Sequence, residues 1–243
     1  MFRSIFLALC LLIVGINGCF LTNSSRQPVS QDYIAQIQTV GLISLLPQRA
    51  NISYLENSAM ESHFSNAVVD GWDPETIVLE NFISRLKRKN LNTKTLDVPS
   101  GLEALKNSDW NKPTTDSVAE RIYALGDKEA VDMILVIRPN VEKDAVTKTN
   151  QNIRGFGIQR AFDTPAFVYA SVHLEIFDIR RKFSVGRASA LQSERALEGL
   201  WTESFLNGTH THAMKESDST KFRQQVSSVL NEAVGIAARE IGL

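Results

Sequence analysis

The residues of this chain best suited to chemistry are its histidines, of which there are four. His173 and Glu175 are two residues apart in a segment where apolar and polar residues alternate, so both side chains project from the same face of a strand. An imidazole beside a carboxylate can act as a general acid–base couple. On a solvated sheet face the same two side chains have no catalytic role, and we favour that interpretation.

A second pair of histidines, His210 and His212, flanks Thr211. In an extended chain the two imidazoles project from one side and make half of a metal site. No cysteine or further histidine lies nearby, and residues 207–215 are polar in the manner of a loop. We therefore predict no metal and no cofactor.

The motifs of the large enzyme classes are absent from the chain. It contains no G-x-S-x-G elbow, no phosphate loop ending in G-K-[ST], no H-E-x-x-H and no C-x-x-C. The sequence therefore predicts a protein that is not an enzyme. The alternative is a hydrolase or a metal-dependent enzyme that uses His173 or the His210–His212 pair.

Cys19 follows a segment with the features of an export signal. Arg3 is the only charged residue before an apolar run from Ile5 to Ile16, which is shorter than the about 20 residues that span a bilayer. The residues Ile16-Asn17-Gly18-Cys19 resemble the lipobox of bacterial lipoproteins, which implies acylation of Cys19. An ordinary cleaved signal followed by a stray cysteine is the alternative. Phe20 in place of aspartate implies, by resemblance to enteric lipoproteins, the outer membrane and a domain facing the periplasm.

The size and charge of the remaining chain limit its class. Without residues 1–18 it carries 25 basic and 27 acidic residues, since only Arg3 is lost, and this balance argues against a nucleic-acid partner. Residues 19–37 are polar and without periodicity, so we expect a flexible tether. Residues 38–243 have the length of one domain.

Hydrophobic periodicity within residues 38–243 predicts strands and helices in alternation. We expect a strand over residues 40–46, a second over 51–55 that pairs with it, and further strands over 92–98 and 133–137. Asp73-Pro74-Glu75 predicts a helix start, and Ser117 with Glu120 predicts another that ends at Gly126. Alternation over residues 167–177 and 183–191 predicts a long β-hairpin, and an apolar stripe predicts a C-terminal helix. Together these elements predict an α/β sandwich, with a mixed sheet and helices packed on it.

Three aromatic residues are candidates for contact with a partner. Trp72 precedes the expected helix start, Trp110 lies in a polar stretch, and Phe156 stands between Gly155 and Gly157. Exposed aromatic side chains are common anchors of protein interfaces. The alternative for each is a place at the edge of the core, and for residues 155–160 a flexible connection.

Two segments resemble a loose group of bacterial envelope lipoproteins that includes the curli-secretion lipoprotein and the activators of penicillin-binding proteins. The similarity rests on an acid before a buried strand, in Val131-Asp132-Met133-Ile134-Leu135-Val136, and on a strand that ends in Ile176-Phe177-Asp178. Arg180-Arg181-Lys182 replaces the Thr-Gly usual in the following turn. The resemblance implies a domain like an anticodon-binding domain. We therefore expect a non-catalytic lipoprotein that binds another envelope protein, as an accessory in assembly of a surface or cell-wall machine.

Overall fold

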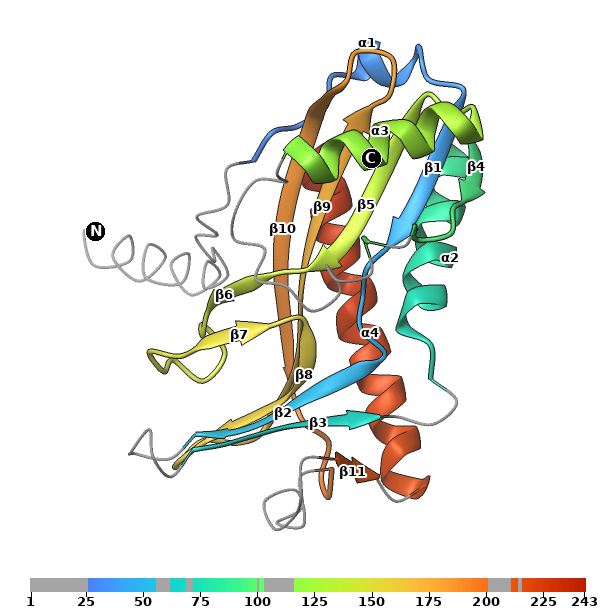
Figure 1. Ribbon diagram of the computed structural model, residues 1–243. Coiled ribbons are helices and arrows are strands. Elements are labelled where there is room, and N and C mark those ends of the chain that lie inside the picture. Colours follow the sequence, from blue (N-terminus) through green and yellow to red (C-terminus); the bar gives the residue numbers. More distant parts are fainter. Residues whose placement is uncertain are drawn as a thin grey trace, which may run out of the picture.

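The computed structural model describes residues 26–55, 62–68, 72–99, 101–102, 116–200, 211–213 and 216–243. One large mixed sheet carries helices on both faces (Figure 1), which confirms the expected α/β sandwich. Its strands are β1 (Thr39–Ser44), β2 (Arg49–Leu55), β3 (His63–Val68), β4 (Asn92–Thr95), β5 (Met133–Pro139), β8 (Phe156–Ala161), β9 (Phe167–Asp178), β10 (Phe183–Arg195) and β11 (Thr211–Ala213). A separate small hairpin consists of β6 (Val141–Lys143) and β7 (Asn152–Arg154).

The sheet divides at strand β9. On one side β9 pairs with β10 along its whole length. On the other side it pairs first with β8 and then with β5, so the order of the sheet is β11-β3-β2-β8-β9-β5-β1-β4. At the fork, Ser171 N donates to Gly155 O and Ser171 O accepts from Asn140 N. Gly155 adopts a φ of 57° there, which glycine adopts without strain.

The fork explains the glycines around Phe156. A Cβ on Gly157 would lie 2.0 Å from the carbonyl oxygen of Asn51 on β2, its partner strand. Residues 155–160 are therefore neither a recognition loop nor a flexible connection, because all of them after Gly155 belong to β8. Strand β2 pairs with β3 and β8. The expected pairing of β2 with β1, the strand that precedes it, is therefore wrong.

The long helices form where caps and apolar stripes predicted them. Helix α2 (Pro74–Arg88) begins after Asp73, whose Oδ1 accepts from the backbone N–H groups of Glu75 and Thr76. Helix α4 (Glu216–Ile241) buries its stripe, from Phe222 to Ile241, against one face of the sheet together with α2.

Helix α3 (Asp116–Glu129) covers the other face and runs past its expected end at Gly126. A Cβ on Gly126 would lie 2.5 Å from the side chain of Ile179. The glycine serves close packing here and not a helix stop.

The N-terminal part of the described chain corrects the expected tether. Residues 26–37 pack on the domain, with Val29, Tyr33 and Ile34 in the core and a short helix α1 (Gln31–Ile34). Gln27 pairs with Arg187 at the edge of β10, and Val29 N donates to Ile241 O. Three apolar side chains in an otherwise polar segment gave no periodicity, yet each one fills a place in the core.

None of the helices in the described part of the chain has both the length and the hydrophobicity that crossing a bilayer requires.

Candidate functional site

A cluster of polar side chains lies in the middle of the sheet, on the face that α3 partly covers. We call Arg138, His173, Glu175, Arg187 and Ser189 the polar cluster. The strand register brings it together, since His173 on β9 stands opposite Arg138 on β5 and Ser189 on β10. The next row in register places Glu175 beside Arg187. Polar side chains at these depths must be hydrogen-bonded or paired to be tolerated.

His173 is enclosed in this cluster in its neutral form. Its Nδ1 is 2.6 Å from Ser189 Oγ, and its Nε2 is buried without a hydrogen-bond partner. Burial, with the positive charges of Arg138 and Arg187, lowers the pKa of His173 to about 3. An imidazole with so low a pKa is a weak base, and Ser189 is only 3 % exposed, so a substrate has little access to either group.

The acid–base couple that the sequence offered as an alternative for His173 and Glu175 is not formed. Glu175 Oε2 lies 3.6 Å from Arg138 Nη2, and both residues are almost fully buried. Burial lowers the pKa of Arg138 to about 10, against the opposing effect of the Glu175 charge. The charge pair therefore links β5 to β9, while the contact of His173 with Ser189 links β9 to β10, and the carboxylate is not engaged with the imidazole.

The state of His173 predicts a pH dependence of stability. Its pKa is about 3 in the folded chain and about 6.5 when unfolded, so its contribution is complete above pH about 6.5 and is lost as the pH falls toward 3. From pH 7 to pH 5 this loss amounts to about 2 kcal/mol. We expect His173→Asn, which keeps a polar group beside Ser189, to lose that much less stability in urea unfolding across this interval. Parallel losses in both proteins would contradict the assignment.

The acid that carries the lipoprotein resemblance has a structural task. Asp132 Oδ2 accepts from the backbone N–H groups of Gln38 and Thr39 at the start of β1. Its Oδ1 binds Arg180 of the β9–β10 turn at 2.5 Å. Burial raises the pKa of this carboxyl, but the two N–H groups and Arg180 outweigh it and hold the pKa below its usual value. The basic residues that replace Thr-Gly thus fasten the turn to acids of the domain.

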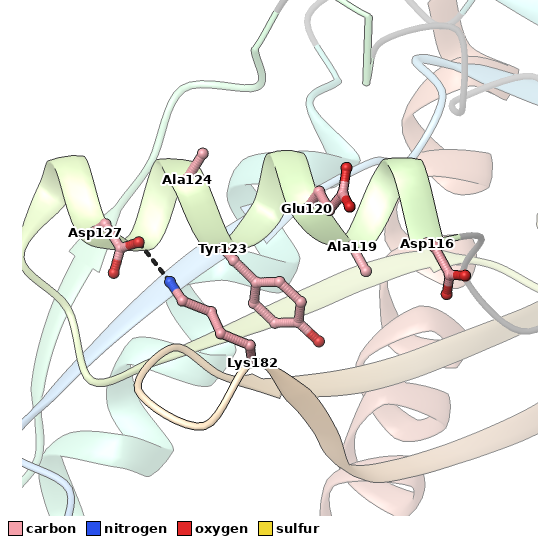
Figure 2. Close-up of a pocket in the computed structure, with 7 residues that line it drawn as sticks. All are labelled: Asp116, Ala119, Glu120, Tyr123, Ala124, Asp127 and Lys182. Atoms are coloured by element: carbon pink, nitrogen blue, oxygen red, sulfur yellow. Dashed lines mark hydrogen bonds and ion pairs between the residues drawn. The ribbon is translucent and has the colours of Figure 1, made fainter.

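An open hollow of about 510 Å³ lies between α3 and the β9–β10 turn (Figure 2). Lys182 extends from the turn along the hollow, forms an ion pair with Asp127 and lies 5.6 Å from the centre of the Tyr123 ring. Asp116 projects from the start of α3 and Glu120 from its next turn. Burial, then Glu175, raises the pKa of Tyr123, so the phenol stays protonated. The hollow can accommodate a cationic group, but Lys182 already neutralises one of its three acids.

The aromatic residues proposed as anchors do not lie on the surface. Phe156 is fully buried on β8, and Trp72 packs edge-on against it at 5.1 Å. Trp72 is 8 % exposed, and its Nε1 donates to Ser227 Oγ on α4. The expectation of surface anchors is therefore wrong for both, because Trp72 packs against Phe156 of β8 and Phe222 of α4. Trp110 lies outside the described residues.

The other sequence candidates are only partly within the described chain. Cys19 and His210 lie outside it, while the backbone of His212 belongs to β11 and pairs with Ala67 of β3. No cluster of three or more potential metal-ligating His, Cys, Asp or Glu side chains occurs among the described residues.

Two phenylalanines that sequence reasoning missed are exposed at one end of the sheet. Phe64 is 57 % exposed and Phe162 is 45 % exposed. They flank the end of β2, since Phe64 stands opposite Ser53 and Phe162 N donates to Leu55 O. This end, with the tips of β2, β3 and β8, is remote from α1 (Figure 1). Nothing in the local sequence distinguished these rings from core residues, because each lies in or beside an apolar strand.

Comparison with known proteins gives only weak structural likeness. No protein-family model and no curated protein matches the chain. The hypothetical protein CT253 from Chlamydia trachomatis has 14 % identity and a TM-score of 0.37, over 82 % of this chain and 95 % of its own. The lipoprotein GNA1162 from Neisseria meningitidis has 12 % identity and a TM-score of 0.33, over 82 % and 99 %. The C-terminal domain of LpoB from Salmonella enterica has 9 % identity and a TM-score of 0.25, over 66 % and 90 %. A lipoprotein is thus among the weak neighbours, and similarity at this level transfers no function.

Proposed function

We propose that this chain is an envelope lipoprotein, held at the periplasmic face of the outer membrane by acyl groups on Cys19, that binds another envelope protein without catalysing a reaction. The anchor rests on the apolar leader and on Ile16-Asn17-Gly18-Cys19. More than one acyl chain is needed for stable attachment, and an acylated N-terminal cysteine meets that need. The domain then acts as an accessory to the assembly in which its partner works.

The exposure of Phe64 and Phe162 carries the binding part of the proposal. Two large apolar rings at one end of the sheet, one on each side of β2, expose apolar surface that a partner could cover. Aromatic residues dominate the binding energy of protein interfaces, and the burial of such rings against a partner is favourable. They take the role that the sequence assigned to Trp72 and Phe156.

The polar cluster supports the non-catalytic part. His173, the imidazole of the alternative enzyme, is neutral, enclosed and without a carboxylate partner. A general base needs a pKa nearer the working pH and reach to a substrate proton. Among the described residues that line the hollow beside α3 there is no histidine, cysteine or serine.

Photocrosslinking in intact cells tests the binding surface. Benzoylphenylalanine at position 64 or 162 is expected to capture the same envelope protein, because both rings enter one interface. Position 183 is the matched control, since Phe183 is also 45 % exposed. It begins β10 after the β9–β10 turn, at the end of β9 opposite to Phe162. We expect that adduct to be absent at position 183. An identical adduct at all three positions, or none at 64 and 162, would contradict the proposal.

A further inference from the structure

Two arginines converge on the outer side of the helix pair α2 and α4. A Cβ on Gly235 of α4 would lie 2.7 Å from Nη2 of Arg85 and 3.7 Å from Nη1 of Arg239. Both guanidinium groups therefore lie over the surface of α4 at Gly235, which has no side chain. Glycine lowers helix stability relative to alanine by about 1 kcal/mol. Gly235 therefore makes α4 less stable, but it allows the two positively charged groups to approach the helix and each other.

The side chain of Arg85 is positioned by a chain of amides. Its Nε donates to Asn81 Oδ1 at 2.6 Å, and Asn81 Nδ2 donates to Asn231 Oδ1 on α4 at 3.0 Å. Held through Nε, the guanidinium keeps its Nη groups available for an acceptor. Within the described residues, Arg85 and Arg239 have no carboxylate at ion-pair distance.

The charges around this site add to one another. Lys87, Arg88 and Lys89 are exposed at the end of α2, and Lys89 Nζ reaches Gly242 O at the end of α4. Burial, then Arg239 and Arg88, lowers the pKa of Arg85, as expected where cations repel. Two helix C-termini contribute only about half a negative charge each, which five cations exceed.

The basic site, formed by Arg85, Arg88 and Arg239, lies close to Arg26, the first residue of the described chain. Arg26 forms an ion pair of 2.5 Å with Glu240, the residue after Arg239. Arg26 is seven positions after Cys19, and a fully extended chain over that interval covers at most about 25 Å. If Cys19 is acylated as proposed above, the basic site is held near the lipid surface.

We propose that Arg85 and Arg239, with Arg88 beside them, bind the phosphate groups of anionic phospholipids next to the acylated cysteine. Guanidinium groups bind phosphate oxygens in pairs through parallel N–H donors. Basic side chains near a membrane are drawn to its anionic lipids. The inference rests on the lipid anchor of the proposed function, but it assigns a separate contact that the anchor alone does not supply.

Vesicle flotation of the mature chain with Cys19→Ala tests this contact without the anchor. The vesicles are phosphatidylcholine alone, or a mixture in which one lipid in three is phosphatidylglycerol. We expect binding only to the mixture, and a loss on the order of twentyfold in Arg85→Gln/Arg239→Gln, at about fivefold for each basic residue. The control Arg195→Gln/Lys221→Gln removes two exposed charges elsewhere, with Lys221 about 27 Å along α4 from Arg239, and is expected to bind as the parent does.

Equal losses in both double variants, or no binding to anionic vesicles by the parent chain, would overturn the proposal. If Arg85→Gln/Arg239→Gln lowers the melting temperature, Arg88→Gln/Arg239→Gln replaces it with the same expected direction, since both of these side chains are exposed. Incorporation of labelled palmitate by the full chain, lost in Cys19→Ala, measures the anchor independently. Failure of the anchor is thereby separated from failure of the phosphate site.

Discussion

Replacing Phe156 by alanine is expected to lower the free energy of unfolding by about 3–5 kcal/mol. The ring is fully buried and meets Trp72 edge-on at 5.1 Å, while Trp72 in turn contacts Phe222 on α4 at 6.3 Å. Its removal leaves a cavity where β8, the entry to α2, and α4 meet. Urea unfolding followed by circular dichroism measures the loss as a lower midpoint.

Phe162→Ala is the matched control for this prediction. It removes the same ring six residues away from a site that is 45 % exposed, so we expect a change within about 0.5 kcal/mol. A small effect at both positions would mean that Phe156 is not part of the core. Loss of binding without loss of stability in Phe156→Ala would restore the surface role that its flanking glycines suggested.

Gly157→Ala is expected to lower the free energy of unfolding by about 3 kcal/mol or more. The added methyl group would meet the backbone carbonyl of Asn51 at 2.0 Å. No rotamer change relieves a collision between two backbones, and Asn51 is fixed in register with Gly157 across β2 and β8. The strands must separate at the fork, which exposes the core beneath. Thermal unfolding measures the effect as a lower melting temperature.

Gly199→Ala is the control that separates the collision at Gly157 with the Asn51 backbone from the general cost of replacing a glycine. Gly199 has a φ of 77° and nothing within 4 Å of a Cβ, so alanine there costs only about 1–2 kcal/mol of backbone strain. A Gly157→Ala protein as stable as Gly199→Ala would show that β2 and β8 can part without penalty.

Local patterns were sufficient for elements whose signals lie within one segment. Asp73-Pro74-Glu75 predicted the start of α2 because the cap, the proline and the acid all act within one turn. The unbroken apolar run of β5 predicted a strand buried on both faces. Alternation predicted the β9–β10 hairpin, because one face of β9 is uniformly apolar from Val168 to Ile176.

Features that depend on contacts between distant segments could not be predicted in this way. Strand β2 pairs with β8, about a hundred residues away, and no local signal specifies that partner. Gly126 has the composition of a helix stop, but its role follows from Ile179 packing on it. Local sequence also gave no indication that Trp72 would be covered by α4.

The candidate surfaces were missed for the same reason. Phe64 is exposed because of its place at the end of the sheet, and not because of its neighbours in sequence. The site at Arg85 requires Arg239, which lies on another helix 154 positions later. The basic end of α2 alone was compatible with an ordinary helix terminus.

The length of helix α4 also limits how far the domain extends from its N-terminal link. The 26 residues of α4 form a rigid rod about 39 Å long, with Arg26 joined near its C-terminal end. Toward its N-terminal end, Gln225 holds Arg195 at the end of β10. If Cys19 is acylated as proposed, the rod and the extended N-terminal link together place the N-terminal end of α4 at most about 65 Å from the lipid surface. Under that proposal, a partner that contacts this end of the domain must present its binding surface within that distance of the membrane.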